Sequence, residues 1–467
     1  MMHRIPLNSL NKFIKRITCY LVCFVTSYNA ISQSHNWQSF PFKLNGSPRF
    51  FFDDTLTNML VIGGNFDKVD TVTNNFFLWN GTNVSFIKSN QRMPWPPVCA
   101  NRFYNKLYVG GFPSNCGIYL WNDTNLLPLS NTRELISTFY NYHDTLLIGG
   151  FFDSISGVKA GPIAYLNNNK WSSLYGIDTV IGLDIYNNFS SITSIVEYKD
   201  DLYAAGNIDN FGSLKEILRW HNGKWTDVGG GLGSTGDDWV HDMVVYKGEL
   251  YVAGRFFRNG GAADNCIVRW DGVKWKPVGG GVEGTEITDL QVFNNELWAV
   301  GKFWNAGGVP AQWIAKWNGY KWCGLGNTFD NAIGCMGVYN NELYIGGGFR
   351  TIDGDSSMAY IAKWIGGNYT DTCGFVDYSG VSSTNQKQIA INIYPNPTTH
   401  ELHIQTNSTE KLIAQFFDIT GKQVKENTSI NNSENINTQN FSEGIYYLRI
   451  IDANYHLVKI QKVVVIK

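Results

Sequence analysis

The stretch "LYVAGRFFRNGGAADNCIVRWDGVKWKPVGGGV", residues 250–282, has three short apolar runs separated by turn residues. It returns as "LWAVGKFWNAGGVPAQWIAKWNGYKWCGLG" from residue 297 and as "LYIGGGFRTIDGDSSMAYIAKW" from residue 343. Its opening run occurs seven times, with start-to-start spacings of 47, 39, 56, 48, 47 and 46 residues; the runs begin at Leu60, Leu107, Leu146, Leu202, Leu250, Leu297 and Leu343. Repeats of this length indicate stacked supersecondary units and are too long for leucine-rich repeats.

Each repeat predicts four short antiparallel strands. An apolar run and a tight turn precede the "LYVGG"-type run, as in "MVVYKGEL" and "LQVFNNEL". A Gly-bearing loop, an "IVRW" or "IAKW" run, a second turn and a Trp-led strand follow, the last opening on Trp225, Trp275 or Trp322. One such sheet cannot bury both faces, whereas sheets stacked around an axis cover one another. The sequence therefore predicts an all-β fold with a seven-bladed β-propeller over residues 33–376.

These residues resemble the kelch repeat, in which a Gly doublet and an aromatic precede a Trp some fifteen or more residues later. The resemblance extends from Trp37 to about Val376. Three units replace the first Gly of the doublet, at Ala205-Gly206, Ala253-Gly254 and Val300-Gly301, so we expect a propeller that is kelch-like.

Closure of the ring is predicted from "NWQSF" at 36–40, which has the pattern of the Trp-led strand but precedes the first unit. We expect Trp37 to Phe40 to supply the missing outer strand of the seventh blade, because an open ring would expose strand edges. A second series, Trp220, Trp270, Trp317 and Trp364, recurs at one position in successive units. We expect these side chains to pack between adjacent sheets; stacking on carbohydrate is the alternative.

The N-terminus predicts a signal peptide over residues 1–32. Four basic residues, Arg4, Lys12, Lys15 and Arg16, precede the apolar run at 17–30. This run is short for a membrane span, although an N-terminal anchor helix is the alternative. Export leaves six cysteines in the mature chain: Cys99, Cys116, Cys266, Cys323, Cys335 and Cys373. An oxidising compartment permits disulfides, and we predict Cys99–Cys116 and one pair among the last three, with no transmembrane segment in the mature chain.

The blade pattern stops after residue 376. Residues 377–388 are polar and small, which is typical of a linker. Alternating apolar positions in "ELHIQT" and "IAQFFDITG" then predict a small immunoglobulin-like β-sandwich over 389–467.

These residues resemble the C-terminal sorting domain (type A) of the type IX secretion system of Bacteroidetes. The resemblance rests on Tyr394-Pro395-Asn396-Pro397, the "DITGK" turn with Gly421, Gly444 with Tyr446, and the tail with Lys459. An ordinary appended sandwich is the alternative. The resemblance implies that the type IX machinery is a partner, and that the protein passes through the periplasm to the outer-membrane surface or the medium.

Candidate chemistry is concentrated in "GSTGDDWVHDM", residues 233–243. Asp237, Asp238 and His241 could bind a metal or transfer protons, and Trp239 could stack on a sugar. A solvated loop is the alternative, because Asp242 aligns with Asp289 of the next unit and His241 with Thr288. "TIDGDSS" at 351–357 carries only part of a calcium loop and is predicted to be a turn. We expect no cofactor and assign no catalytic residue.

The overall charge excludes a nucleic-acid footprint: 37 Lys and Arg stand against 39 Asp and Glu, a net charge of −2. Residues that do not repeat between units are sparse and mostly Asn, Asp and Gly, whereas an enzyme should gather charged residues at one end of the ring. The sequence therefore favours a surface or secreted binding module for a glycan or a protein. An extracellular glycan lyase or hydrolase, or a structural adhesin, is the alternative.

Overall fold

The chain forms two compact units, residues 1–376 and 377–467, each described by itself. Among the described residues the structure is almost entirely β, with one short 3₁₀ helix, η1 (Ser356–Met358). The computed structural model describes residues 36–86, 93, 95–111, 117–121, 126–129, 135–174, 190–208, 216–232, 238–256, 265–367, 373, 391–408, 411–418, 423–451 and 457–467. The predicted signal peptide, the whole predicted linker, Cys116, Asp237 and Gly421 lie outside these residues.

Among the described residues of the first unit, seven antiparallel sheets of four or five strands follow one another along the chain. The first three pair in the orders β2 (Ser47–Asp54), β3 (Met59–Asn65), β6 (Phe76–Trp79), β7 (Val84–Phe86); β8 (Pro97–Phe103), β9 (Lys106–Gly111), β10 (Ile118–Trp121), β11 (Leu126–Pro128); and β12 (Ile136–Tyr142), β13 (Thr145–Gly150), β16 (Ile163–Asn167), β17 (Lys170–Ser173). Two small hairpins, β4 (Lys68–Val69) with β5 (Val72–Thr73) and β14 (Ser154–Ile155) with β15 (Val158–Lys159), extend the loops of two of these sheets.

The remaining four sheets have the same plan. They are β18 (Ser191–Tyr198), β19 (Asp201–Asn207), β20 (Ile217–His221), β21 (Lys224–Asp227); β22 (Trp239–Tyr246), β23 (Glu249–Arg255), β24 (Ile267–Trp270), β25 (Trp275–Lys276); β26 (Val282–Phe293), β27 (Glu296–Ala306), β29 (Ile314–Trp317), β30 (Trp322–Gly324); and β31 (Ile333–Tyr339), β32 (Glu342–Gly347), β33 (Ile361–Trp364), β1 (Trp37–Gln38). β28 (Val309–Pro310) adds a fifth strand beside β27.

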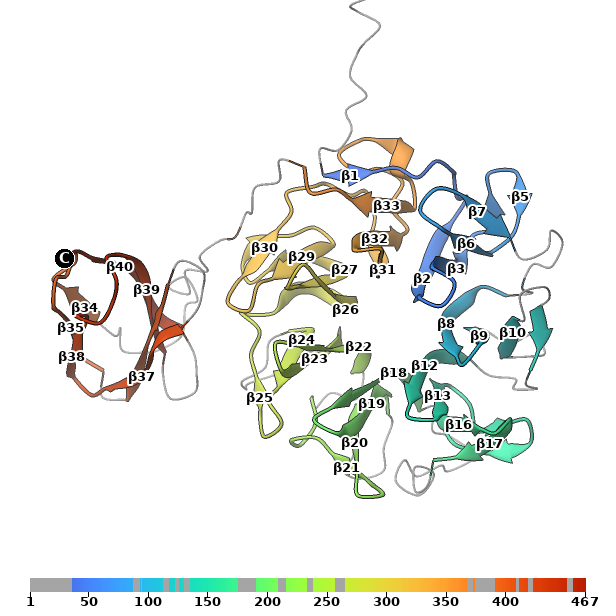
Figure 1. Ribbon diagram of the computed structural model, residues 1–467, viewed down its shortest axis with the longest axis horizontal. Coiled ribbons are helices and arrows are strands. Elements are labelled where there is room, and N and C mark those ends of the chain that lie inside the picture. The colour runs from blue at the N-terminus through green and yellow to red at the C-terminus, as the bar shows by residue number, and fades with distance from the viewer. Residues whose placement is uncertain are drawn as a thin grey trace, which may run out of the picture. The chain divides into compact units, whose positions relative to one another are not determined.

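The first strand of each sheet lies nearest a common centre, as Figure 1 shows. Each first strand contacts the next one along the chain, and β31 contacts β2. Each also shifts register at a corresponding point, for example between Val240 and Asp242 in β22 and between Ile287 and Asp289 in β26. The aligned positions that the sequence indicated are therefore structurally equivalent.

The N-terminal strand completes the last sheet, as predicted. β1 pairs with β33 so that Trp37 lies opposite Trp364, as Trp322 lies opposite Trp317 in the preceding sheet. Trp37 is 1% exposed, and its Nε1 donates to Asn327 Oδ1 at 3.0 Å. The strand ends at Gln38 and does not reach Phe40. Phe40 precedes Pro41, and a residue before proline is sterically restricted while the proline itself has no N–H to give to a ladder.

The same inter-sheet hydrogen bond occurs at the closure as elsewhere. Tyr246 Oη donates to the Asn295 carbonyl of the next sheet at 2.9 Å. Tyr339 Oη of the last sheet donates in the same way to Asn58 of the first, at 2.8 Å. The first and last sheets therefore meet through a contact that neighbouring sheets use.

The recurring tryptophans pack between sheets, as expected. Trp270 and Trp317 are buried, and Trp317 Nε1 donates to Tyr251 Oη of the preceding sheet at 3.3 Å. Beside Trp317, a Cβ built on Gly279 would lie 2.4 Å from the ring, and this glycine has φ of 61°. The close approach and the positive φ together explain the glycine at this point of the repeat.

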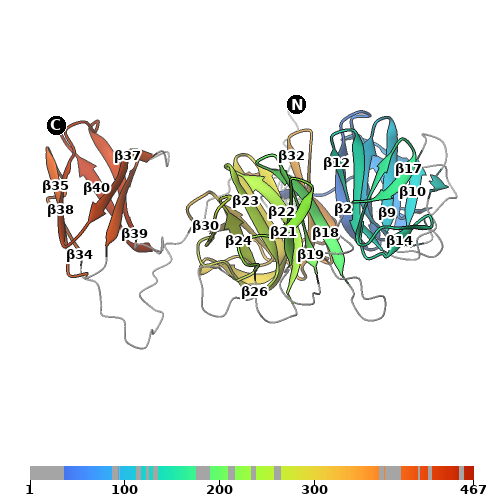
Figure 2. The ribbon, with the colours of Figure 1, turned by 90° about the horizontal axis from the view of Figure 1, so that it is seen from below.

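The second unit is a pair of sheets that face each other (Figure 2). One sheet has the order β34 (Ile391–Tyr394), β35 (Glu401–Thr406), β38 (Ser433–Asn437), and the other β37 (Gln423–Ile430), β36 (Leu412–Phe417), β39 (Gly444–Ile451), β40 (Leu457–Val465). Between them lies a core that includes Leu402, Phe416, Leu448 and Val463.

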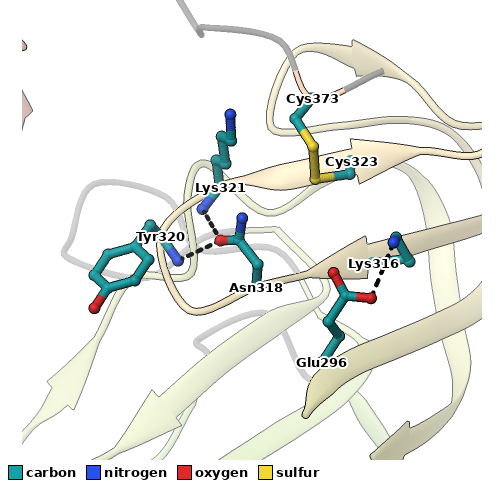
Figure 3. The surroundings of a disulfide bond; sticks show 7 residues. All are labelled: Glu296, Lys316, Asn318, Tyr320, Lys321, Cys323 and Cys373. Carbon is teal, nitrogen blue, oxygen red and sulfur yellow. Dashed lines mark hydrogen bonds and ion pairs between the residues drawn. A yellow bond between two sulfur atoms is a disulfide. The ribbon is translucent and has the colours of Figure 1, made fainter. Parts of the chain in front are cut away.

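One disulfide joins Cys323 to Cys373 (Figure 3). This bond confirms the prediction of a pair among the last three cysteines. Cys323 lies in β30, whose turn from β29 is set by Asn318 Oδ1, which accepts hydrogen bonds from the backbone N–H groups of residues 320 and 321. Cys99 is a free thiol placed to donate to the carbonyl of Ile136, and its predicted partner Cys116 lies outside the described residues. No helix of the described chain is long and apolar enough to cross a membrane.

Candidate functional site

The predicted constellation at 233–243 is partly assembled at the start of β22. Trp239 is 38% exposed, and its ring stacks on that of His241 with centroids 5.6 Å apart and planes 27° apart. Asp238 is buried and so is not available as a surface ligand. Trp239 and His241 are two residues apart on one strand and therefore share a face.

Glu286 of the next sheet contacts the His241 ring, and Lys302 of the same sheet contacts Glu286. His241 Nε2 lies 3.1 Å from Glu286 Oε2, and Lys302 Nζ lies 2.7 Å from Glu286 Oε1. The hydrogen bond with His241, followed by the interaction with Lys302, lowers the pKa of Glu286 to about 2 against the opposing effect of burial. Glu286 is therefore an anion at neutral pH, and it fixes the imidazole beneath Trp239. The sequence missed Glu286 and Lys302 because they belong to another repeat.

The exposed tryptophans of the described residues share one end of the ring. Because neighbouring strands are antiparallel, the first strand of each sheet begins at the end where the second strand finishes; we call this the entry end. Trp239 opens β22, Trp95 immediately precedes β8, and Trp304 lies near the end of β27 with 55% exposure. The opposite end instead carries Tyr104 and Tyr320 in hairpin turns.

Asp242 and Asp289 form a carboxyl pair between adjacent first strands. Asp242 Oδ2 accepts from the Leu290 N–H at 3.0 Å, and Asp289 Oδ2 accepts from the Met336 N–H at 2.5 Å. Burial, followed by the charge of Asp242, raises the pKa of Asp289 well above its ordinary value. Burial also raises the pKa of Asp242, to which Asp289 is hydrogen bonded. These residues link three sheets and were predicted only as equivalent strand positions.

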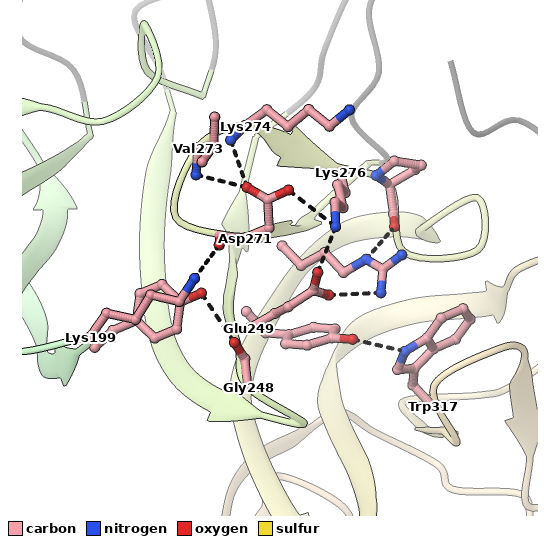
Figure 4. Close-up of polar contacts among 12 residues, drawn as sticks. Lys199, Gly248, Glu249, Asp271, Val273, Lys274, Lys276 and Trp317 are labelled. Carbon is pink, nitrogen blue, oxygen red and sulfur yellow. Dashed lines mark hydrogen bonds and ion pairs between the residues drawn. The ribbon is translucent and has the colours of Figure 1, made fainter. Parts of the chain in front are cut away.

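A second polar network ties the hairpins at the opposite end (Figure 4). Glu249 accepts from Arg269 and Lys276, both at 2.8 Å. Lys199 of the preceding sheet donates to the Asp271 carbonyl, and Lys247 donates to the Asn318 carbonyl one sheet further on. Because these contacts recur between sheets, the charged side chains at this end have a structural role and do not by themselves indicate a ligand site.

The "TIDGDSS" segment is a turn, as predicted. Asp353 and Gly354 have φ of 53° and 81°. The Asp353 carboxylate accepts hydrogen bonds from Thr328 N–H and Asn327 Nδ2. Throughout the part of the chain that the structure describes, no group of three or more His, Cys, Asp or Glu residues is placed to hold a metal ion.

In the second unit, the Tyr394–Pro397 motif covers the free edge of the last strand. Asn396 Nδ2 donates to the Lys462 carbonyl at 2.6 Å, and Asn396 Oδ1 accepts from the Val464 N–H at 2.9 Å. Thr398 N–H then donates to the Val464 carbonyl at 2.8 Å. A segment with two prolines cannot continue as a paired strand, so its side chains and backbone seal this part of the edge of β40.

The other motif residues have structural roles in the sandwich. Tyr446 is buried in the core, and its hydroxyl donates to the Ser442 carbonyl at 2.9 Å. Gly444 has φ of 153°, which side-chain-bearing residues rarely adopt. Lys459 Nζ donates to the Ile391 carbonyl at 2.7 Å and so joins the two sheets. Tyr394 is exposed beside His403.

Comparison with known proteins assigns the second unit. Residues 392–467 match the family described as the secretion system C-terminal sorting domain. This part of the chain is a type IX sorting domain, which indicates export to the cell surface or the medium and interaction with the type IX machinery. No curated protein matches the chain.

Several solved structures are similar to the chain at low identity. The extracellular domain of a hybrid two-component system of B. thetaiotaomicron has a TM-score of 0.43 at 12% identity, covering 90% of this chain and 55% of that one. The chain thus spans about half of that protein. A fungal AA5 alcohol oxidase in complex with copper has a TM-score of 0.41 at 13% identity, covering 92% and 99%. A GH74 enzyme of Niastella koreensis has a TM-score of 0.32 at 11% identity, covering 86% and 67%.

Proposed function

We propose that the protein is an exported binding module whose ligand is a saccharide. In this proposal residues 1–32 are a signal peptide, 33–376 a seven-bladed kelch-like β-propeller, 377–388 a linker and 389–467 an immunoglobulin-like sorting domain of a Bacteroidetes protein. Seven sheets around one centre and the β1–β33 pairing support the propeller. Export through the sorting domain supports a ligand outside the cell, where glycans are accessible.

The exposed, immobilised ring of Trp239 carries the proposal. An indole presents a large apolar surface and a polar N–H, which suits the mixed apolar and hydroxylated faces of a sugar. Contact with His241, held in turn by Glu286, orders the side chain before any ligand arrives. A ring that is already ordered loses little conformational entropy on binding, so more of the contact energy appears as affinity.

The polar groups beside Trp239 suit a hydroxyl-rich ligand. Glu286 offers a carboxylate acceptor, and the side chain of Lys302 is 58% exposed and offers N–H donors. These two charges offset each other, and Arg255, which lies opposite Trp239 in the register and is exposed, adds further N–H donors. Hydroxyl groups can accept from the lysine and donate to the carboxylate in the same site.

A glycan array of the purified full chain tests the proposal. We expect saturable binding that Trp239→Ala weakens at least tenfold, a loss of about 1.4 kcal/mol. Tyr320→Ala, which removes an exposed aromatic at the opposite end, is the matched control and should bind normally. Absence of binding by the unmodified chain, or equal loss in both variants, would contradict a saccharide site at Trp239.

A further inference from the structure

The outward face of the sheet β37–β36–β39–β40 in the sorting domain is unusually apolar. The outward side chains of a sandwich strand are ordinarily polar, because they meet water. In β39, Tyr446 and Leu448 point into the core, whereas Ile445 and Tyr447 alternate with them and are 38% and 39% exposed. An isoleucine and a tyrosine therefore occupy outward positions that are ordinarily polar in a β-sandwich.

Neighbouring strands extend this feature into one patch. In the sheet register Phe417 of β36 lies opposite Tyr447, and Val464 of β40 lies opposite Ile445. Ile466 follows with the same alternation and is 41% exposed. Directly opposite side chains on one face of a sheet are in contact distance. We call Phe417, Ile445, Tyr447, Val464 and Ile466 the outer apolar face.

Basic residues lie beside the outer apolar face. Lys462 is exposed and lies opposite Tyr447 in the register, and Arg449 follows Tyr447 two positions later on the same side of β39. Opposite Arg449 lies Gln415, which is nine-tenths buried and whose Oε1 has no hydrogen-bond partner among the described residues. A partner with apolar residues and carboxylates would complement this surface.

The opposite outer face of the same sandwich is polar. In β35 and β38 the outward residues include His403, Gln405, Ser433 and Asn435, paired across the two strands. Tyr394, which lies opposite His403 and is 51% exposed, is the exception on this face. The cluster of apolar side chains lies on the other face, and surface patches of this kind mark interaction sites.

We propose that the outer apolar face is the surface on which a component of the type IX secretion machinery docks, through an apolar patch flanked by carboxylates. The inference rests on the sorting role of residues 392–467 and is independent of saccharide binding. Docking on a face rather than by strand addition follows from the edge of β40, where Asn396 and Thr398 already occupy backbone groups of Lys462 and Val464.

Export of the full chain from a host with a type IX system tests this proposal. We expect Ile445→Ser/Tyr447→Ser to lower the amount at the surface and in the medium at least tenfold and to leave the chain in the periplasm. His403→Ser/Gln405→Ser is the matched control, with two outward positions changed on the other face, and should be exported normally. Thermal unfolding of both purified variants measures whether the sandwich remains folded.

If the serine variant is unstable, the exposed residue Lys462 beside the outer apolar face provides the test of docking. Lys462→Glu removes no packing, and we expect it to reduce export while leaving the melting temperature unchanged. Normal export of a folded serine variant, or of Lys462→Glu where the serine variant is unfolded, would overturn the docking surface. So would a dimer of the purified chain that dissociates in the serine variant while export persists, because a second copy would then occupy the face. Normal export after deletion of 391–467 would instead remove the sorting role itself.

Discussion

Asp289 shows how a single side chain can couple stability to pH. Its carboxyl is enclosed between first strands, contacts Asp242 and accepts from the Met336 N–H. Burial and the neighbouring charge raise its pKa, so the folded protein holds a proton that the unfolded chain loses near pH 4. Above that pH the folded state binds more protons than the unfolded state, and the free energy of unfolding falls as pH rises.

Asp289→Asn should remove this dependence. An amide can accept from Met336 and donate to Asp242 without ionising. We expect the melting temperature of the unmodified protein to fall relative to that of the variant between pH 4 and pH 8, by roughly 2–4 °C for each kcal/mol. Asp200→Asn, at an exposed hairpin turn, is the control for loss of a carboxylate. Parallel pH curves for Asp289→Asn and the unmodified protein would contradict a shared proton at this pair.

At this scale the sequence identified positions but not partners. Aligning the repeats placed Asp242 and Asp289 at one strand position, and the register shifts confirm it. The contacts of His241 with Glu286, 45 residues away, depend on how closely two sheets approach. An alignment of the repeats does not give the distance between neighbouring sheets. The carboxyl pair and the His241 contacts therefore required the structure.

Among the elements, the two-residue strand β1 contributes more to stability than its length suggests. Trp37 is almost fully buried against Trp364 and Phe329, with ring centroids 4.9 Å and 6.0 Å away. Truncation would leave a cavity and remove the hydrogen bond that Trp37 donates to Asn327. We expect Trp37→Ala to lower the free energy of unfolding by about 3–5 kcal/mol, measured by urea unfolding.

Trp239→Ala is the control for Trp37→Ala, because it removes the same side chain from an exposed position. It should lower the free energy of unfolding by less than Trp37→Ala does, because 38% of Trp239 is exposed whereas Trp37 is 1% exposed. If the two variants were equally stable, β1 would not hold the first and last sheets together. The strand was predictable because Trp37 repeats the pattern of Trp322. The end of the strand at Gln38 was not predictable, because the effect of Pro41 depends on where the chain must leave the sheet.

Across the whole molecule, the choice of disulfide follows from the order of the sheets. Six cysteines allow fifteen pairings, so the sequence left the partner open. Cys323 lies on the outermost strand of the sixth sheet, and Cys373 follows the third strand of the seventh. The bond therefore encloses the strands β31, β32 and β33, the same sheet that β1 completes. The sheet that contains both the first and the last strand of the first unit is therefore held by strand pairing and by a covalent bond.

Loss of this bond should destabilise the exported protein strongly. The two cysteines are 50 residues apart, and cross-linking a loop of this length restricts the unfolded chain by about 4 kcal/mol. We expect dithiothreitol and the Cys323→Ser/Cys373→Ser variant to lower the melting temperature of the full chain by similar amounts. The reductant should have no further effect on that variant, because Cys99, Cys266 and Cys335 are free thiols. An equal response of the variant and the unmodified protein to reductant would show that another disulfide carries the stabilisation.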